Sequence, residues 1–194
     1  NHAEVFYANG MVEKPEDETD HARMIRLNTE LAELERAITQ LGNVKLVIFD
    51  PLSEYLGKGD RNSDADVRGV LTPLSDMARR LGIAIVAVHH INKRSKEVSA
   101  VQTVGGAGAW TQVPRTVLHV VNDPEDEEIN FTRRRLMICT KSNYGGTNEG
   151  QVYRLTEGKH PAVQWLPEVI TLDAEQVVRS SRQQEDGRHK TQRR

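Results

Sequence analysis

The stretches VKLVIFDPLSEYLG (44–57) and NSDADVRGVLTPLSDMARRLGIAIVAVHH (62–90) decide the fold. The first opens with a nearly continuous apolar run that ends at Asp50, which is typical of a buried strand in a parallel sheet. A second apolar run occupies residues 83–88. Residues 44–88 therefore predict one strand-helix-strand crossover, the unit from which open parallel sheets are built.

Two amphipathic helices are expected around these strands. After the N-capping residue Ser63, apolar residues recur at steps of three and four until Gly82, with Pro73 indicating a kink. An earlier helix is predicted from Met24 to Leu41 on the same grounds. Both helices have one apolar face to pack on a sheet.

The rest of the chain reads as strands and polar segments. Short strands separated by turn-rich loops are predicted over 116–121, 134–141, 150–155 and 162–166, and a further one over 3–9. The Arg-rich end has no apolar residue from 179 onward and is expected to be disordered. We expect one partial domain over 1–170 and a polar tail over 171–194.

Composition excludes several classes of protein. The 194 residues suit one core, and the longest apolar run is far shorter than the roughly 20 residues that cross a bilayer, so no membrane association is expected. The single cysteine, Cys139, excludes an internal disulfide framework and a cysteine-based zinc site. A soluble, cytoplasmic protein is predicted. The net charge of −2 gives no general attraction to nucleic acid.

Polar residues follow both predicted parallel strands. Asp50 closes the first one, where a carboxylate is well placed to bind Mg²⁺ through water, although an Asp that only opens the Asp-Pro turn explains it equally well. His89 and His90 close the second. Adjacent side chains on an extended segment point to opposite sides, so at most one imidazole is expected to face the crevice.

A basic loop follows the histidines. Lys93, Arg94 and Lys96 precede a glycine-containing segment at 105–108, a pattern that fits phosphate or nucleic-acid contact as well as an ordinary surface loop.

Several motifs in one order resemble a known family. LVIFDPLSEYLG, the 62–93 segment, GGAGAWTQVPRTVLHVV, CTKSNYGG and GQVYRL are together similar to the RecA-like AAA ATPases of phages and plasmids, relatives of a hexameric plasmid replicative helicase. The resemblance covers roughly residues 1–157. It implies a RecA-like P-loop NTPase core, an α/β fold with a mostly parallel sheet, here with a β-rich C-terminal part.

The resemblance also implies roles for individual residues. Asp50 matches the Walker B carboxylate that positions Mg²⁺, and the His89-His90 pair matches the γ-phosphate sensor. Arg115 matches an arginine that lies near phosphate, often in a neighbouring subunit, and Lys141, with Asn143 beside it, matches a second basic position. It implies ATP and Mg²⁺ as cofactors, DNA as a partner and a homo-oligomeric ring. Arg115 and Lys141 also flank predicted strands and could equally be exposed termini.

One part of the family pattern is missing from the sequence. No G-x-x-x-x-G-K-[ST] loop is present, and Glu54 follows Asp50 too late to serve as the general base. We therefore expect the chain to be the second half of an ATPase domain, with the phosphate loop upstream. Alone, it is expected to bind little or no ATP and not to hydrolyse it, and to expose a sheet edge and an apolar face.

Two other functions fit the residues. One is a metal-dependent phosphatase or nuclease that uses Asp50 with His89 or His90 as ligands, and tight Mn²⁺ or Zn²⁺ binding would indicate it. The other is a non-catalytic module that binds DNA or a partner through residues 93–108 and the basic tail. Salt-sensitive DNA binding without a nucleotide effect would indicate that module.

Overall fold

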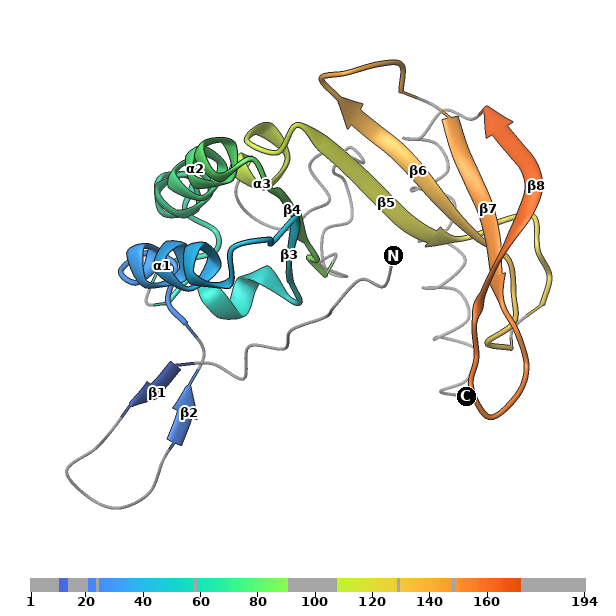
Figure 1. Cartoon of the computed structure of the whole chain (residues 1–194). Helices are drawn as coiled ribbons and strands as arrows, with labels where there is room; N and C mark the ends of the chain where they lie inside the picture. The colour runs from blue at the N-terminus through green and yellow to red at the C-terminus, as the bar shows by residue number, and fades with distance from the viewer. Residues whose placement is uncertain are drawn as a thin grey trace, which may run out of the picture. The chain divides into compact units, whose positions relative to one another are not determined.

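The chain forms two compact units in a computed structural model (Figure 1). The structure describes residues 11–13, 21–23, 25–57, 59–90, 108–128, 130–147 and 149–171. Unit 1 comprises Asn1–Ile91 and Gly106–Val113, and unit 2 comprises Asn92–Gly105 and Pro114–Arg194. The predicted strand over 3–9, the basic loop and the tail beyond Thr171 lie outside the described residues. The single partial domain predicted over 1–170 stays a prediction.

Unit 1 contains the predicted crossover. Strand β3 (Leu46–Phe49) pairs in parallel with β4 (Ala84–Ala87), and helix α2 (Asp64–Leu81) connects them. The register sets Ile48 beside Val86. The expectation of one strand-helix-strand unit over 44–88 is thus confirmed.

Helix α2 begins and ends where the sequence predicts. The Ser63 hydroxyl accepts a hydrogen bond from the Asp66 N–H, and Gly82 ends the helix with a left-handed φ of 64°. The helix runs on through Pro73. One side is buried at the spacing of an amphipathic helix, at Val67, Val70, Leu71, Leu74 and Met77.

Helix α1 (Leu31–Leu41) is shorter than predicted. The expected start at Met24 is wrong for the described part, because residues 27–29 form a turn. There the Leu27 N–H donates to the Tyr55 carbonyl oxygen at 2.8 Å, and the Glu30 carboxylate accepts the Arg26 N–H at 2.7 Å. These bonds commit the backbone to a turn before the first helical residue.

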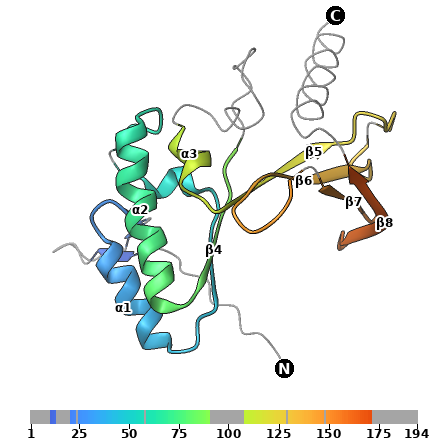
Figure 2. The same ribbon diagram turned by 90° about the horizontal axis from the view of Figure 1, so that it is seen from above.

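The β3–β4 pair has one covered and one open face. Helices α1 and α2 lie side by side along one side of the strands (Figures 1 and 2), with an ion pair from Arg80 to Glu35 at 2.8 Å between them. On the opposite face Leu46, Ile48 and Val86 are 49%, 60% and 48% exposed. The strands are therefore not buried on both faces, whereas the predicted uncovered apolar face is present.

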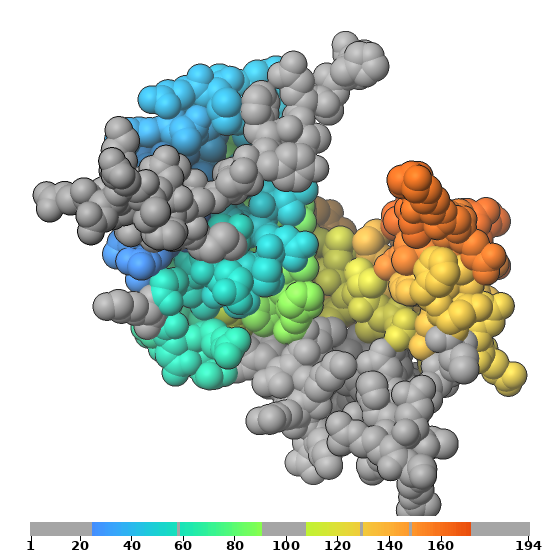
Figure 3. Space-filling model, turned by 90° about the horizontal axis from the view of Figure 1, so that it is seen from below, coloured from blue at the N-terminus to red at the C-terminus, as the bar shows by residue number. Residues whose placement is uncertain are grey.

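Shorter elements complete unit 1. Strands β1 (Met11–Glu13) and β2 (His21–Arg23) form an antiparallel pair, and a 3-10 helix, η1 (Leu52–Tyr55), follows β3. In the space-filling view the cyan segment that includes η1 lies against the green end of β4 (Figure 3). A four-residue helix, α3 (Ala109–Gln112), was not expected from the sequence.

Unit 2 is an antiparallel sheet in the order β5-β6-β7-β8. Its four strands confirm the predicted ones, although the last runs on to Thr171. The fold is mixed α/β: the predicted parallel sheet is present as the β3–β4 pair, and the predicted β-rich C-terminal part is an antiparallel sheet. The β6–β7 and β7–β8 connections, residues 143–148 and 156–162, favour antiparallel neighbours, because a parallel pair needs a crossover of a dozen residues or more. The bounds are β5 Thr116–Asn122, β6 Arg135–Ser142, β7 Glu149–Leu155 and β8 Val163–Thr171.

One face of this sheet carries the core of unit 2. The core alternates with outward residues along each strand, as expected for a half-buried antiparallel sheet. It consists of Val121, Leu136, Ile138 and Val152, with Leu166 and Ile170 packed against it.

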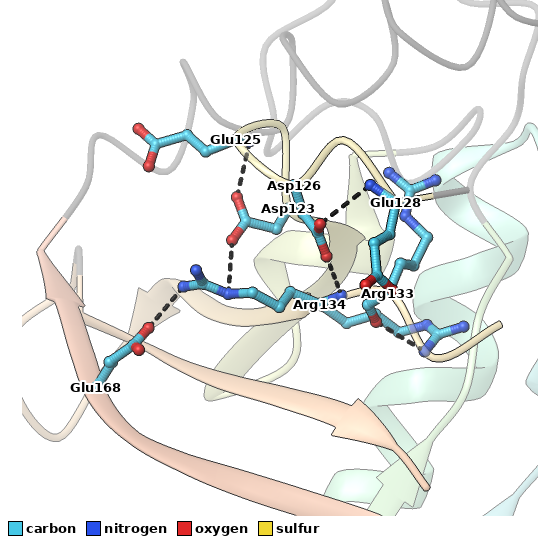
Figure 4. Close-up of polar contacts among 8 residues, drawn as sticks. Asp123, Glu125, Asp126, Glu128, Arg133, Arg134 and Glu168 are labelled. Carbon is cyan, nitrogen blue, oxygen red and sulfur yellow. Dashed lines mark hydrogen bonds and ion pairs between the residues drawn. The ribbon is translucent and has the colours of Figure 1, made fainter. Parts of the chain in front are cut away.

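An ionic network fixes the β5–β6 connection to β8 (Figure 4). The Arg134 guanidinium pairs with Asp123 at 3.2 Å and with Glu168 of β8 at 2.6 Å, while its backbone N–H donates to Asp126 at 2.6 Å. The Asp123 side chain is only 6% exposed. A buried carboxylate needs such a partner, so Arg134 is the residue on which this end of the sheet depends.

Replacing Arg134 tests that network. Arg134→Met leaves the Asp123 carboxylate buried without its cation, and we expect a loss of about 2 kcal/mol in the stability of unit 2. The exposed control Arg154→Met is expected to change stability by less than about 0.5 kcal/mol. Native-state hydrogen exchange of the β5 and β6 amides measures both. Equal protection in the two variants would contradict the network's role.

Candidate functional site

Two backbone hydrogen bonds join the ends of β3 and β4 at the point where Asp50 follows β3. The Val88 N–H donates to the Phe49 carbonyl oxygen at 2.8 Å, and the Val88 carbonyl accepts the Leu52 N–H at 2.9 Å. Pro51, which follows Asp50 through a cis peptide bond, has no N–H to give, so Leu52 supplies the donor. These bonds carry the parallel pairing one step beyond the strands and set Asp50 across from Val88.

The Asp50 side chain suits a hard cation. It is exposed, and among the described residues its carboxylate has neither a hydrogen-bond donor nor an ion-pair partner. Mg²⁺ keeps several of its waters and is commonly bound by one or two carboxylates together with substrate phosphates. Within the described ranges no three His, Cys, Asp or Glu side chains gather as a ready-made metal site. Asp50 thus fits a water-bridged Mg²⁺ ion.

The adjacent histidines lie in different surroundings. His89 is half-buried, and its ring stacks on the indole of Trp110 with centroids 4.4 Å apart and planes 27° apart. His90 is exposed. His90 is thus the accessible imidazole, and the expectation that at most one of the two faces a crevice stays a prediction.

The environment of His89 favours its neutral form. Within the part of the chain that the structure describes, its buried Nδ1 has no hydrogen-bond partner. Burial lowers the pKa of His89 below 6.5, and the neighbouring charges of His90 and Arg61 lower it further. His89 is therefore a packed, uncharged ring near neutral pH.

Helix α3 supplies the surface on which His89 rests. Trp110 is buried, and its Nε1–H donates to the Arg61 carbonyl oxygen at 3.1 Å. The Ala109 N–H donates to the Asp64 carboxylate at 2.7 Å. Asp64 also accepts from Arg68 at 2.7 Å, a bond that lowers the pKa of Asp64. These contacts hold α3 on the N-terminal end of α2.

The predicted residues of unit 2 come together at one end of the β5–β6 hairpin. The Asn143 N–H donates to the Arg115 carbonyl oxygen at 2.9 Å, and the Arg115 guanidinium donates to the Tyr144 hydroxyl at 3.0 Å. The Lys141 ammonium donates to the Pro114 carbonyl oxygen at 2.7 Å. Partial burial lowers the pKa of Lys141. Arg115 and Asn143 are exposed.

The predicted site residues therefore form two groups, each within its own unit. Asp50, His89 and His90 lie at the parallel strand ends of unit 1. Arg115, Lys141 and Asn143 lie in unit 2, where β5 begins and β6 ends, away from the β5–β6 connection. The predicted nucleic-acid loop, with Lys93, Arg94 and Lys96, lies outside the described residues.

Sequence reasoning missed Trp110 and the polar residues that hold α3. A four-residue helix is too short to show a periodic pattern, and Asp64 reads only as a first-turn acid of α2. The available signal was a large aromatic residue, Trp110, directly after a glycine-containing loop.

Comparison with known families gives a match that covers most of the part of unit 1 that precedes Ile91. Residues 4–96, just under half of the chain, match the model of a family described as an AAA domain. The match includes Asp50 and both histidines and ends before Arg115. It supports an ATPase of the AAA or RecA-like kind and implies nucleotide use in general.

No curated protein matches the chain significantly. None of the helices within the described ranges is long and apolar enough to span a bilayer.

The surroundings of His89 predict a pH effect. In the folded chain the pKa of His89 lies below its ordinary 6.5, so the unfolded state binds more protons as the pH falls through that value. The free energy of unfolding of unit 1 therefore decreases as the pH falls below about 6.5. NMR titration of the imidazole should give a midpoint below 6.5.

The control is an exposed histidine in unit 2. We expect His89→Gln to weaken the acid sensitivity of unit 1, and His160→Gln to leave it unchanged. A His89 midpoint at or above 6.5 would contradict the packed, neutral ring.

Proposed function

We propose that this chain carries the metal-positioning strand ends of an ATP-hydrolysing site in a RecA-like ATPase. The resemblance to phage and plasmid proteins favours an oligomeric, helicase-like enzyme that acts on DNA in replication or recombination. ATP with Mg²⁺ is the proposed cofactor pair.

The position of Asp50 carries this proposal. It follows the carboxyl end of β3, where the backbone hydrogen bonds of Phe49 and Leu52 to Val88 set it across from Val88. His89 and His90 follow the neighbouring strand, β4. Ligands of open parallel sheets bind at the carboxyl ends of strands, where the loops diverge. An exposed carboxylate and an exposed imidazole thus flank one sheet edge suited to a metal-bound phosphate.

Each residue has a distinct task in this scheme. Mg²⁺, when bound, supplies positive charge against the phosphate oxygens. Asp50 would hold it through water, and His90 would donate a hydrogen bond to the terminal phosphate. His89 stays packed on Trp110 and keeps that strand end in place.

The unit 2 residues are proposed to act on phosphate from a neighbouring subunit. Arg115 is exposed, lying 5.8 Å over the Tyr144 ring, so it can leave that ring without uncovering a buried charge. Lys141 and Asn143 would support it, and a cation inserted this way makes hydrolysis depend on assembly of a homo-oligomeric ring. Lys93, Arg94 and Lys96 are the proposed DNA contacts.

The decisive test removes the Asp50 charge. ATP hydrolysis is measured for the 194-residue chain and for the longest product that its gene encodes. In the product that hydrolyses ATP, Asp50→Asn should lower kcat at least about 10-fold, because the metal loses its anionic partner.

The matched control is Asp76→Asn, which removes a half-exposed carboxylate on α2 that pairs with Arg79 at 2.9 Å. Its kcat should stay within about twofold of the wild type. Equal rates in Asp50→Asn and Asp76→Asn would contradict the proposed role of Asp50. If neither wild-type product hydrolyses ATP, the enzyme proposal fails and the non-catalytic binding module takes its place.

A further inference from the structure

A ring stack ties the end of β4 to α3. The imidazole of His89 lies 4.4 Å from the indole of Trp110, centroid to centroid, at an interplanar angle of 27°. Trp110 is only 5% exposed, and its Nε1–H is held by the Arg61 carbonyl oxygen at 3.1 Å. The indole is thus fixed at its edge while its face supports the histidine.

Helix α3, which carries Trp110, is held by hydrogen bonds with α2. Asp64 on α2 accepts the Ala109 N–H at the start of α3, and Arg68, one turn along α2, donates to the side chain of Gln112 at its end. Asp64 and Arg68 are joined by a 2.7 Å ion pair. Both ends of α3 are therefore tied to the same helix, so Trp110 has little freedom to follow a moving strand end.

The stack on Trp110 is the described contact that holds the His89 ring. Among the described residues its buried Nδ1 has no hydrogen-bond partner. A buried polar atom is usually hydrogen-bonded, so within this part of the chain the aromatic contact, and not a bond to Nδ1, places the ring. Removal of the indole would take away the one described ring contact of His89.

We propose that Trp110 is the positioning residue for His90. By holding His89 inward, the stack directs the next side chain outward, because successive side chains on an extended segment point to opposite sides. His90 is exposed whereas His89 is half-buried, as this arrangement requires. The inference rests on the proposed function, since His90 acts on a phosphate only if nucleotide binds at the Asp50 edge.

The test compares two tryptophans. Trp110→Leu removes the stack, and Trp165→Leu makes the same change at a half-exposed residue of β8. In the 194-residue chain, Trp110→Leu should raise the NMR titration midpoint of His89 toward 6.5 and shift the His90 ring resonances. Trp165→Leu should do neither. Unchanged histidine resonances in Trp110→Leu would overturn the inference.

Kinetics give a second readout. In the product that hydrolyses ATP, Trp110→Leu should lower kcat about 10-fold with KM within about twofold, because a misplaced His90 affects the reacting phosphate more than binding. Trp110→Phe keeps a stacking ring and should recover most of kcat. A wild-type rate in Trp110→Leu would overturn the positioning role.

Two further measurements separate the placement of His90 from folding and from ATP hydrolysis. If Trp110→Leu does not fold, nuclear Overhauser contacts between the His89 and Trp110 rings of the wild type decide it, and their absence overturns it. A wild type without ATP hydrolysis defeats the proposed function alone, while the histidine resonances still judge the placement of His90.

Discussion

Two backbone hydrogen bonds of Val88 hold the candidate site together. By bonding to Phe49 and Leu52, Val88 joins the ends of two strands that are separated along the chain by the whole of α2. Asp50 lies between those two partners, and the histidines follow Val88 directly. Among the described residues these two bonds continue the pairing of β3 and β4 beyond the strands, so the spacing of carboxylate and imidazoles depends on them.

The hydrogen bonds of Val88 set where Asp50 and the histidines lie along the strands. Packing sets the directions in which the two histidine side chains point. Adjacent histidines have similar chemistry, yet one is half-buried on an indole and the other is exposed. The difference arises from α3, which two residues of α2 hold in place. A helix that connects the strands therefore also orders their ends.

The sequence predicted those elements whose patterns extend over many residues. The crossover, the caps Ser63 and Gly82 and the four strands of unit 2 follow from periodicity and turn chemistry. The sequence also pointed to Asp50 and the histidines, but it could not tell which imidazole packs inward. That choice depends on Trp110, a contact across 21 residues of sequence that no local pattern encodes. The late start of α1 likewise follows from a tertiary bond, that between Leu27 and Tyr55.

The most direct test of the account asks where a metal-bound nucleotide lies. Mn²⁺ with ATP is added to the longest product of the gene, and paramagnetic broadening of the amide and side-chain resonances is mapped. The account predicts broadening centred on Asp50 and His90, weaker at His89, and abolished in Asp50→Asn. Broadening that leaves the β3 and β4 ends untouched, or that persists in Asp50→Asn, would contradict it.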